Sequence, residues 1–589
     1  MNLINNGNTN YHICYDYNAS ECIRFASFEL QKYLYKATKT CIPVFSSKCP
    51  RRGPEIHLGK VVRGIDYTNY LKGLSDEGFV IKTNGDDLII TSKIDRGILY
   101  GVYYLLERLI NLKCYSYDEI DYDEKDTIEI QNLDIKKDFD FEYREVYFHD
   151  AFNRTFASMN MLNSNLAELD STVGGKTKWF NFHHSFSDLV SPLEYFDNHP
   201  EYFSYIDGKR VKEHTELCLS NEHVYNLALE KVKTWIKASP ECKVFSVAQD
   251  EWMGHFIKMA CECEKCKAFD DAHGSQAASV IRFASKIADE INKEYPDKLI
   301  HTFAYQYSRK VPKDIYVSPN LIVRLCNIEC SWDKSIEEGA LDKTSENYKF
   351  LNDLLGWSKI TNRLYIWDYT VNFRNYLLPF PCLKSMYENM HFYKKHNVKG
   401  VLMQGNFSSG GRGYCDELKS FLCARVLGFD ERSLEDIVMD FTKHYYKDAW
   451  LECYNYIMLF EYTVKGHKLW LYDDSDSSYF TDEVVLKAKE IIDKALEKVL
   501  ESDLTIKKRV LALYASFLYL SITRMPLDSI DRCKKIDNFV ILIKELGITE
   551  LFERTELNYS IKIMKESRYC KDRPNWYSLY YVMRWWKKS

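Results

Sequence analysis

The chain has 589 residues, of which 46% are hydrophobic and 28% are charged, and its formal net charge at pH 7 is -6. A chain of this length exceeds one ordinary domain, so we expect one large domain with flanking domains. The near-balanced charge excludes a strongly basic surface, which makes nucleic acid and anionic membranes poor partners.

The amino-terminal stretch MNLINNGNTNYHICYDYN has no basic segment followed by an apolar stretch of signal-peptide length. No later apolar run is long enough to span a membrane. These features predict a cytoplasmic protein. Since a reducing compartment keeps most of the 18 cysteines as thiols, we interpret them chiefly as small buried hydrophobic residues.

Residues 1–135 mix helical and strand patterns. Residues 19–38 and 96–110 carry apolar side chains at helical spacing, and residues 78–92 form two β-rich runs joined by a turn at Gly85. No catalytic residue types cluster there. We therefore predict a small α/β domain with a supporting role.

Between residues 136 and 414, short β-rich runs alternate with helical stretches, as in βα units around a parallel sheet. The predicted strands cover residues 142–148, 179–184, 216–220, 243–249, 300–307, 321–329, 363–369 and 400–407. This count predicts a (β/α)8 barrel, in which polar residues at strand ends meet at the carboxyl-terminal mouth. Residues 415–589 change to long amphipathic helices, which predict a carboxyl-terminal helical domain.

Asp250 and Glu251 directly follow the predicted fourth strand. Glycoside cleavage needs a carboxylic acid to protonate the leaving oxygen, and a group that stabilises positive charge at the anomeric carbon. In substrates with a 2-acetamido group, the substrate's own carbonyl can act as nucleophile. Glu251 as the acid and Asp250 as the residue that orients the acetamide fit this chemistry, which requires no cofactor. The structural alternative is a solvated acid pair that opens a loop.

Other polar and aromatic residues also end predicted strands. Glu329 and Asp368 are candidates for a conventional nucleophile or for a bond to a sugar hydroxyl, and equally for structural carboxylates. Residues that could stack on or hydrogen-bond to a sugar are Tyr305, Tyr307, Trp367 and Asn406. Individually, each of these four side chains is more often part of a core than part of a ligand site.

Two His-containing pairs also end predicted strands: His149-Asp150 ends the first and His183-His184 the second. Such ligands raise a metal-dependent hydrolase as a rival, although no His-x-His or His-Glu-x-x-His spacing is present. We place His183 among the sugar-binding candidates instead.

Cys261, Cys263 and Cys266 put three thiols within six residues. Thiols this close can hold Zn²⁺, but a structural site usually has four ligands, and a second Cys-x-x-Cys pair is missing. A remote cysteine or His255 would have to complete the site. The alternative is reduced thiols in a loop.

Several blocks within the barrel region resemble a known family. They are residues 199–211, 217–221, 245–251, 261–266, 303–313, 322–330, 365–381 and 403–407. In this order they resemble the domain of unknown function 4838, which is similar to glycoside hydrolase family 163, where some members have endo-β-N-acetylglucosaminidase activity. The resemblance implies an oligosaccharide or glycan as the partner of this chain.

The first domain, notably residues 96–110, resembles the α/β domain that precedes the barrel in family 20 hexosaminidases and in α-glucuronidases. In family 20 an adjacent Asp-Glu pair after the fourth strand performs substrate-assisted hydrolysis, which implies the same roles for Asp250 and Glu251. Arg144 similarly resembles a sugar-binding arginine of that family. Two departures are the identity of the acidic pair, which is often Asn-Asp in relatives, and Met403, near which some relatives have an acid.

The leading hypothesis is therefore retaining hydrolysis of a β-linked N-acetylglucosaminide. One alternative is hydrolysis of another glycoside, such as a uronide, by Glu251 with Glu329 or Asp368 as its partner. The other is a non-catalytic barrel that binds carbohydrate.

Overall fold

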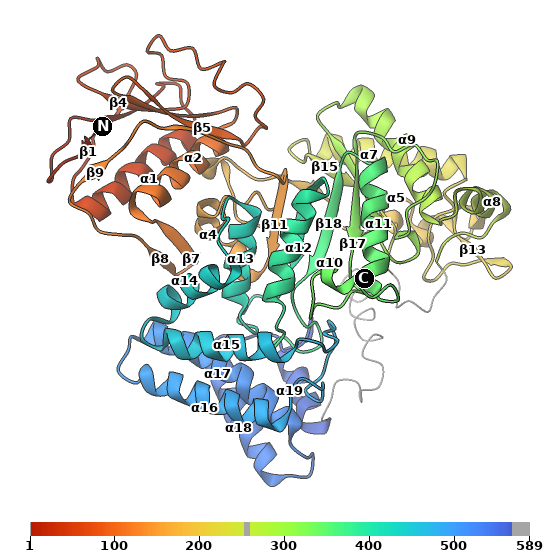
Figure 1. Cartoon of the computed structure of the whole chain (residues 1–589). Helices are drawn as coiled ribbons and strands as arrows, with labels where there is room; N and C mark the ends of the chain where they lie inside the picture. Colours follow the sequence, from red (N-terminus) through yellow and green to blue (C-terminus); the bar gives the residue numbers. More distant parts are fainter. Residues whose placement is uncertain (1, 252–258, 568–589) are drawn as a thin grey trace. The chain divides into compact units, whose positions relative to one another are not determined.

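The computed structural model of the chain describes residues 2–251 and 259–567 (Figure 1). Contacts between Cα atoms divide the chain into two compact units. Unit 1 contains Met1–Lys176, Cys415–Tyr454 and Lys494–Val510, and unit 2 contains Thr177–Tyr414, Asn455–Asp493 and Leu511–Ser589. The three domains predicted from the sequence stay a prediction.

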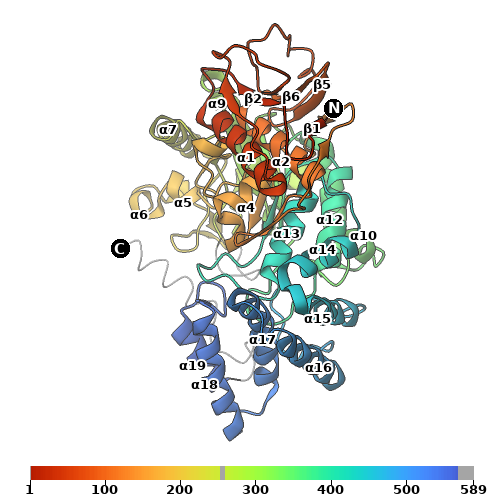
Figure 2. The same cartoon turned by 90° about the vertical axis from the view of Figure 1, so that its left-hand side faces the viewer.

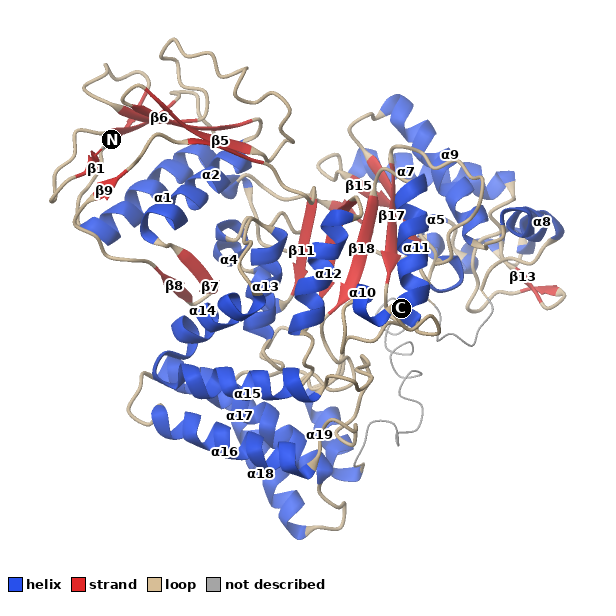
Figure 3. Ribbon diagram, in the orientation of Figure 1, coloured by secondary structure: helices blue, strands red, loops and turns tan. Residues whose placement is uncertain are grey.

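Unit 1 contains a mixed sheet in the order β10-β5-β6-β4-β2-β3. These strands are β2 (His12–Tyr15), β3 (Val44–Ser46), β4 (Glu55–Leu58), β5 (Phe79–Asn84), β6 (Asp87–Ser92) and β10 (Asp134–Lys137). Helices α1 (Glu21–Thr38) and α2 (Asp95–Ile110) pack against each other and against this sheet (Figure 3). The predicted helices and hairpin are confirmed: β5 and β6 pair antiparallel, and Gly85 has the positive φ, 61°, that the tight turn requires.

The rest of unit 1 consists of short strands and helices. The strands are β1 (Asn2–Ile4), β7 (Lys113–Ser116), β8 (Glu119–Asp121), β9 (Ile128–Glu129) and β11 (Tyr143–Tyr147). The helices are α3 (His149–Phe152), α4 (Arg154–Met159), η1 (Ser171–Val173), α13 (Asp416–Leu427) and α14 (Leu434–Tyr446). Strand β11 corresponds to the first strand predicted from the sequence.

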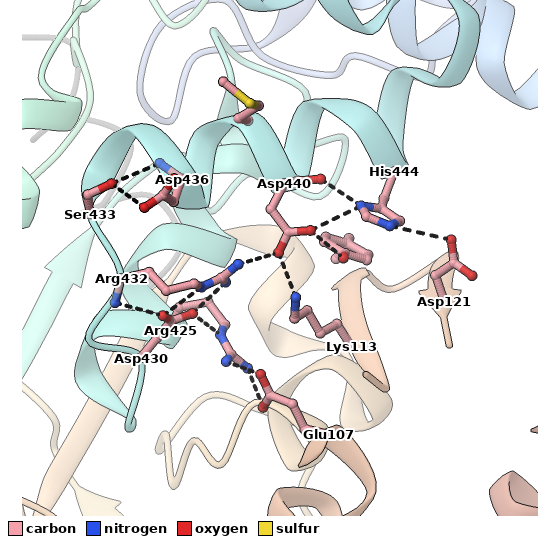
Figure 4. Close-up of polar contacts among 12 residues, drawn as sticks. Glu107, Lys113, Asp121, Arg425, Asp430, Arg432, Ser433, Asp436, Asp440 and His444 are labelled. Atoms are coloured by element: carbon pink, nitrogen blue, oxygen red, sulfur yellow. Dashed lines mark hydrogen bonds and ion pairs between the residues drawn. The ribbon is translucent and has the colours of Figure 1, made fainter. Parts of the chain in front are cut away.

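A carboxylate on α14 joins this helix to strand β7 within unit 1 (Figure 4). The Asp440 side chain accepts hydrogen bonds from Lys113 Nζ at 2.7 Å, Tyr115 Oη at 2.9 Å and Arg432 Nη1 at 2.7 Å. His444 Nδ1 lies 3.1 Å from the same carboxylate. Although burial alone raises the pKa of Asp440, the bonds from His444, Lys113 and Arg432 hold it well below its ordinary value.

We expect Asp440→Asn to lower the free energy of unfolding by about 3 kcal/mol at pH 7, because it leaves the buried ammonium of Lys113 without its carboxylate and removes the charge beside Arg432. A depressed folded-state pKa stabilises the fold above the unfolded-state pKa of about 3.9, and this contribution is lost as the pH falls through the folded-state value. The difference between wild type and variant should therefore narrow below about pH 4. Urea unfolding at several pH values measures it, and Asp436→Asn, on the exposed face of α14, is the matched control. A difference that is independent of pH would contradict the assignment.

Unit 2 is built on a parallel sheet that curls as a half barrel (Figure 3). Its neighbouring strands, in sheet order, are β19 (Val398–Gln404), β18 (Leu364–Tyr369), β17 (Leu321–Cys326), β16 (Leu299–Ala304), β15 (Val244–Ser246) and β12 (Trp179–Phe180). Every pair among them is parallel. The strands are almost entirely buried, as expected for a parallel sheet covered by helices.

Helices lie between most of these strands in the chain, which confirms the predicted alternation. The longer ones are α7 (Glu222–Ala238), α9 (Ala277–Glu294), α11 (Glu346–Ile360) and α12 (Leu383–Lys395). Short segments are α5 (Phe186–Leu189), α6 (Pro192–Tyr195), η2 (Pro200–Tyr202), β13 (Tyr205–Ile206), β14 (Lys209–Arg210), α8 (Glu264–His273), η3 (Gln306–Ser308) and α10 (Ile336–Gly339).

The strand predicted at residues 216–220 was wrong. Strand β12 pairs directly with β15, and Leu217 makes only an isolated antiparallel bridge with Phe203. The backbone of this segment is hydrogen-bonded to the loop after η2, because Ser204 N–H donates to the Glu216 carbonyl and Cys218 N–H donates to the Tyr202 carbonyl. Its apolar run, residues 217–219, therefore lies in a loop.

After α14 the chain continues with the short helix η4 (Lys447–Ala449). The helices that follow it are α15 (Trp450–Thr463), α16 (Asp482–Lys498), α17 (Leu504–Arg524), α18 (Ile530–Glu545) and α19 (Leu557–Glu566). Helices α18 and α19 lie side by side in unit 2 (Figure 2). The predicted carboxyl-terminal helical region is thus confirmed. Among the residues that the structure describes, no helix is both long and apolar enough to cross a membrane.

Candidate active site

The ends of three neighbouring strands bring the candidate residues together. Strands β12, β15 and β16 are adjacent and parallel, so the residues that follow them emerge at the same edge of the sheet. His184 follows β12, Asp250 and Glu251 follow β15, and Tyr305 follows β16. The sequence prediction that strand ends gather the polar residues is confirmed for this group.

Two side chains lie against the carboxylate of Glu251, and one of them donates a hydrogen bond to it. Its Oε1 accepts a hydrogen bond from Tyr305 Oη at 2.8 Å, and its Oε2 lies 3.6 Å from His184 Nε2. The Glu251 side chain is 34% exposed, so a ligand can reach it. Burial, and then the charge of Glu251, raise the pKa of Tyr305 well above its ordinary value, which keeps this phenol a hydrogen-bond donor.

His184 is oriented by the segment that follows β15 and contains Glu251. Its Nδ1 lies 2.6 Å from the carbonyl oxygen of Gln249. Because a carbonyl can only accept, Nδ1 carries the hydrogen, and Nε2 is directed at Glu251. Gln249 also ties the neighbouring loop in place, since its Oε1 accepts from Ser308 Oγ at 2.5 Å and its Nε2 donates to the Tyr305 carbonyl at 3.0 Å.

Asp250, the residue before Glu251 in the chain, is only 6% exposed. Its Oδ2 accepts the backbone N–H of Ser187, in the first turn of α5, at 2.8 Å. Burial raises the pKa of Asp250 to about 6. The carboxyl group therefore gains and loses its proton near pH 6, within the pH range in which many enzymes work.

Glu216 is a second buried acid beside Asp250, and the sequence analysis missed it. The N–H of Asp250 donates to Glu216 Oε2 at 3.1 Å. Burial, and then the charge of Asp250, raise the pKa of Glu216 well above its ordinary value. The signal in the sequence was a glutamate directly before the apolar run LCL (residues 217–219), which we had interpreted as part of a strand.

An aromatic cluster lies on the same sheet. Trp367, on β18, is 9% exposed and donates from Nε1 to Gln404 Oε1 at 2.7 Å. The guanidinium carbon of Arg324, fully buried on β17, lies 5.3 Å from the ring centre of Trp367 and 4.1 Å from that of Trp179. The ring of His183 is 6.3 Å from that of Trp367. The sequence analysis missed Arg324, whose only signal was a charge within the apolar run of a strand.

Two predicted carboxylates already have structural partners. Asp368 Oδ1 accepts from Asn327 Nδ2 at 2.7 Å, and its Oδ2 accepts from Tyr393 Oη at 2.6 Å, inside the protein. Glu329 Oε2 accepts from Arg309 Nη1 at 2.8 Å. These contacts favour structural roles for both acids over the predicted nucleophile.

The contact with sugar predicted for Arg144 needs correction. Arg144 is fully buried on β11 in unit 1, and its guanidinium donates to Glu77 Oε2 at 2.5 Å and to the carbonyl of Met161. Although burial alone raises the pKa of Glu77, Arg96 and Arg144 lower it to about 2. A guanidinium already saturated by a buried ion pair has a structural role.

Of the remaining predicted residues, Asn406 is buried and Tyr307 is partly buried. Asn406 accepts the N–H of Ser408 at 3.1 Å, and Tyr307 lies near Glu216. Met403 is fully buried on β19. A hollow of about 510 Å³ lies elsewhere in unit 2, lined by residues of α7, α8 and α9. It contains none of the residues around Glu251, so the geometry of the carboxylate, and not this hollow, identifies the site.

Residues that could hold a metal ion were also predicted. Among the described residues, side chains of His, Cys, Asp or Glu gather closely enough only at Cys218, Cys261, Cys263 and Cys266. The rival interpretation was a metal-dependent hydrolase. Its proposed ligands, His149, Asp150, His183 and His184, are not part of this group of close side chains. His255, considered as a ligand, lies outside the described residues.

Two regions of the chain match models of known protein families. Residues 114–457 match the family model described as "Domain of unknown function (DUF4838)", and residues 7–105 match the model described as "Glycosyl hydrolase family 67 N-terminus". Both resemblances predicted from the sequence are thus confirmed. The comparison with curated proteins gives no match.

Solved structures with similar folds include one titled "A novel family GH115 4-O-Methyl-alpha-glucuronidase, BtGH115A, with specificity for decorated arabinogalactans". It is 9% identical, with a TM-score of 0.55 over 93% of this chain and 80% of that chain. A GH138 enzyme targeting pectin rhamnogalacturonan II is 10% identical, with a TM-score of 0.44 over 95% of this chain and 98% of that chain. The first likeness shows a shared fold.

Proposed function

We propose that this chain, which belongs to the DUF4838 family, is a glycoside hydrolase with Glu251 as its general acid. The observation that carries the proposal is the Glu251 carboxyl group, one-third exposed and held between Tyr305 and His184 at the edge of a parallel sheet. With Tyr305 donating to Oε1, the transferable proton resides on Oε2. After that proton has left, the hydrogen bond from Tyr305 stabilises the carboxylate that remains.

The substrate class that we propose is a β-linked N-acetylglucosaminide. Glu251 protonates the glycosidic oxygen as the bond to the anomeric carbon breaks, and the acetamide oxygen of the substrate bonds to that carbon to form an oxazolinium ion. Asp250 accepts the acetamide N–H in this step. Water then attacks the anomeric carbon and gives its proton to Glu251, so the product keeps its configuration. The adjacency of Asp250 and Glu251 supports this assignment.

A uronide hydrolase is the second candidate, favoured by the match of residues 7–105 to the family 67 amino-terminal model. The reaction would need a conventional nucleophile beside Glu251. Because Asp368 and Glu329 are already bonded within the protein, this candidate lacks a second carboxylate from the predicted pair.

The test is hydrolysis of a panel of nitrophenyl glycosides and N-glycan oligosaccharides by the purified chain. We expect cleavage of β-linked N-acetylglucosaminides, with retained configuration by NMR and inhibition by a thiazoline analogue of the oxazoline. Cleavage of uronides alone would replace the proposed substrate. Tight binding of oligosaccharides without any hydrolysis would favour the non-catalytic carbohydrate-binding alternative.

A further inference from the structure

Four cysteine sulfur atoms from two separate segments meet in unit 2. Cys261, Cys263 and Cys266 come from the start of α8 and the residues before it, and Cys218 comes from the loop before α7. All four sulfur atoms lie within 4.8 Å of one another. Cys218 thus supplies the remote fourth ligand that the three-thiol pattern required.

The spacing of the sulfur atoms distinguishes between two ways of joining them. Cys218 Sγ lies 3.6 Å from Cys263 Sγ and 4.0 Å from Cys266 Sγ. A disulfide requires about 2.0 Å between sulfur atoms. Two thiolates on one tetrahedral Zn²⁺, each at about 2.3 Å from the ion, lie about 3.8 Å apart. The observed separations agree with the edges of such a tetrahedron.

The surroundings of the cluster suit thiolates. The N–H of Tyr205 donates to Cys261 Sγ at 3.3 Å, and Arg210 Nη1 lies 3.6 Å from the same atom. Cys263 is the amino-terminal cap of α8 and Cys266 lies in its first turn, where the helix dipole favours negative charge. We propose that Cys218, Cys261, Cys263 and Cys266 bind one structural Zn²⁺, because four soft ligands in tetrahedral geometry select this ion.

The proposed site fixes the chain beside the acidic pair. Cys218 lies two residues after Glu216, whose carboxyl group contacts Asp250. The N–H of Glu262 donates to the Tyr205 carbonyl at 2.7 Å, which joins the second segment to the hairpin of β13 and β14. Apart from Tyr205, the cluster that these cysteines form contains no large apolar side chain. A metal ion would therefore replace the missing core of this region.

The first experiment measures metals in the full-length chain, produced with zinc in the medium and purified without metal-affinity steps. We expect one zinc ion per chain, measured by inductively coupled plasma mass spectrometry. Mercurial modification of the thiols should release this zinc to a chromogenic chelator, and exchange with Co²⁺ should give the absorption bands of tetrahedral cobalt thiolate. Zinc well below one per chain, iron in its place, or disulfides among these cysteines would overturn the proposal.

The second experiment assigns the ligands. We expect Cys218→Ser and Cys263→Ser each to lower the zinc content at least tenfold, whereas Cys242→Ser, at a buried cysteine outside the cluster, should keep one zinc per chain. Equal zinc in all three variants would overturn the assignment. If a ligand variant aggregates, the release and Co²⁺ experiments on the wild type decide the question, because they need no mutation.

Discussion

Glu251→Gln is expected to lower kcat/KM for β-linked N-acetylglucosaminide oligosaccharides about 1,000-fold, the usual contribution of a general acid. Glutamine keeps the shape of the side chain and can still accept the hydrogen bond from Tyr305, so the fold should be unchanged. The loss should be smaller for nitrophenyl glycosides, whose leaving group needs little protonation. Steady-state kinetics on the two substrate types measures this difference.

Glu337→Gln, on the exposed surface of α10 in the same unit, is the matched control and should keep wild-type activity. Thermal unfolding of both variants should match the wild type. Equal losses on both substrate types would contradict the acid role, because only proton donation depends on the leaving group. Full activity of Glu251→Gln would move the catalytic centre elsewhere.

Asp250→Asn is expected to lower kcat/KM for substrates with a 2-acetamido group about 100-fold, because the acetamide loses the charged acceptor that positions it. Since the folded-state pKa of Asp250 is about 6, wild-type kcat/KM should rise with pH through about this value as the carboxylate forms. The variant should lose that limb of its pH profile. Kinetics between pH 4 and 8 tests both statements.

The same substitution should raise stability. A raised folded-state pKa contributes stability that is fully present below the unfolded-state pKa, about 3.9, and is lost as the pH rises through about 6. Asparagine never ionises, so at pH 8 the free energy of unfolding of Asp250→Asn should exceed that of the wild type by about 3 kcal/mol. At pH 4 the two should agree. A variant that loses stability and activity together would show that Asp250 is structural.

Local sequence patterns were enough to place the candidate residues after buried strands. The run before Asp250 and Glu251 is short, apolar and β-rich, so the pair had to follow a buried strand, and Tyr305 follows another by the same pattern. Parallel strands of adjacent βα units end at one edge. These two regularities are local or topological, and they were enough to predict that Tyr305 and Glu251 would both lie at the edge where the strands end.

Only the tertiary structure decided which polar residues have other partners. Asp368 and Glu329 occupy the same kind of position as Glu251, and nothing in their local sequence indicates Tyr393 or Arg309 as their partners. Arg144 likewise is bonded to Glu77, which is far away in the sequence. Such hydrogen bonds depend on contacts between distant segments, which residue spacing does not encode.

By itself, the sequence determined the alternation of strands and helices, the placement of Asp250 and Glu251 after a buried strand, and the three neighbouring thiols. These features depend on side-chain periodicity and short separations along the chain. The tertiary structure alone decided that Cys218 joins those thiols, that Glu216 lies beside Asp250, and that residues 216–220 form a loop. The physical reason is that each depends on how separate segments pack in three dimensions.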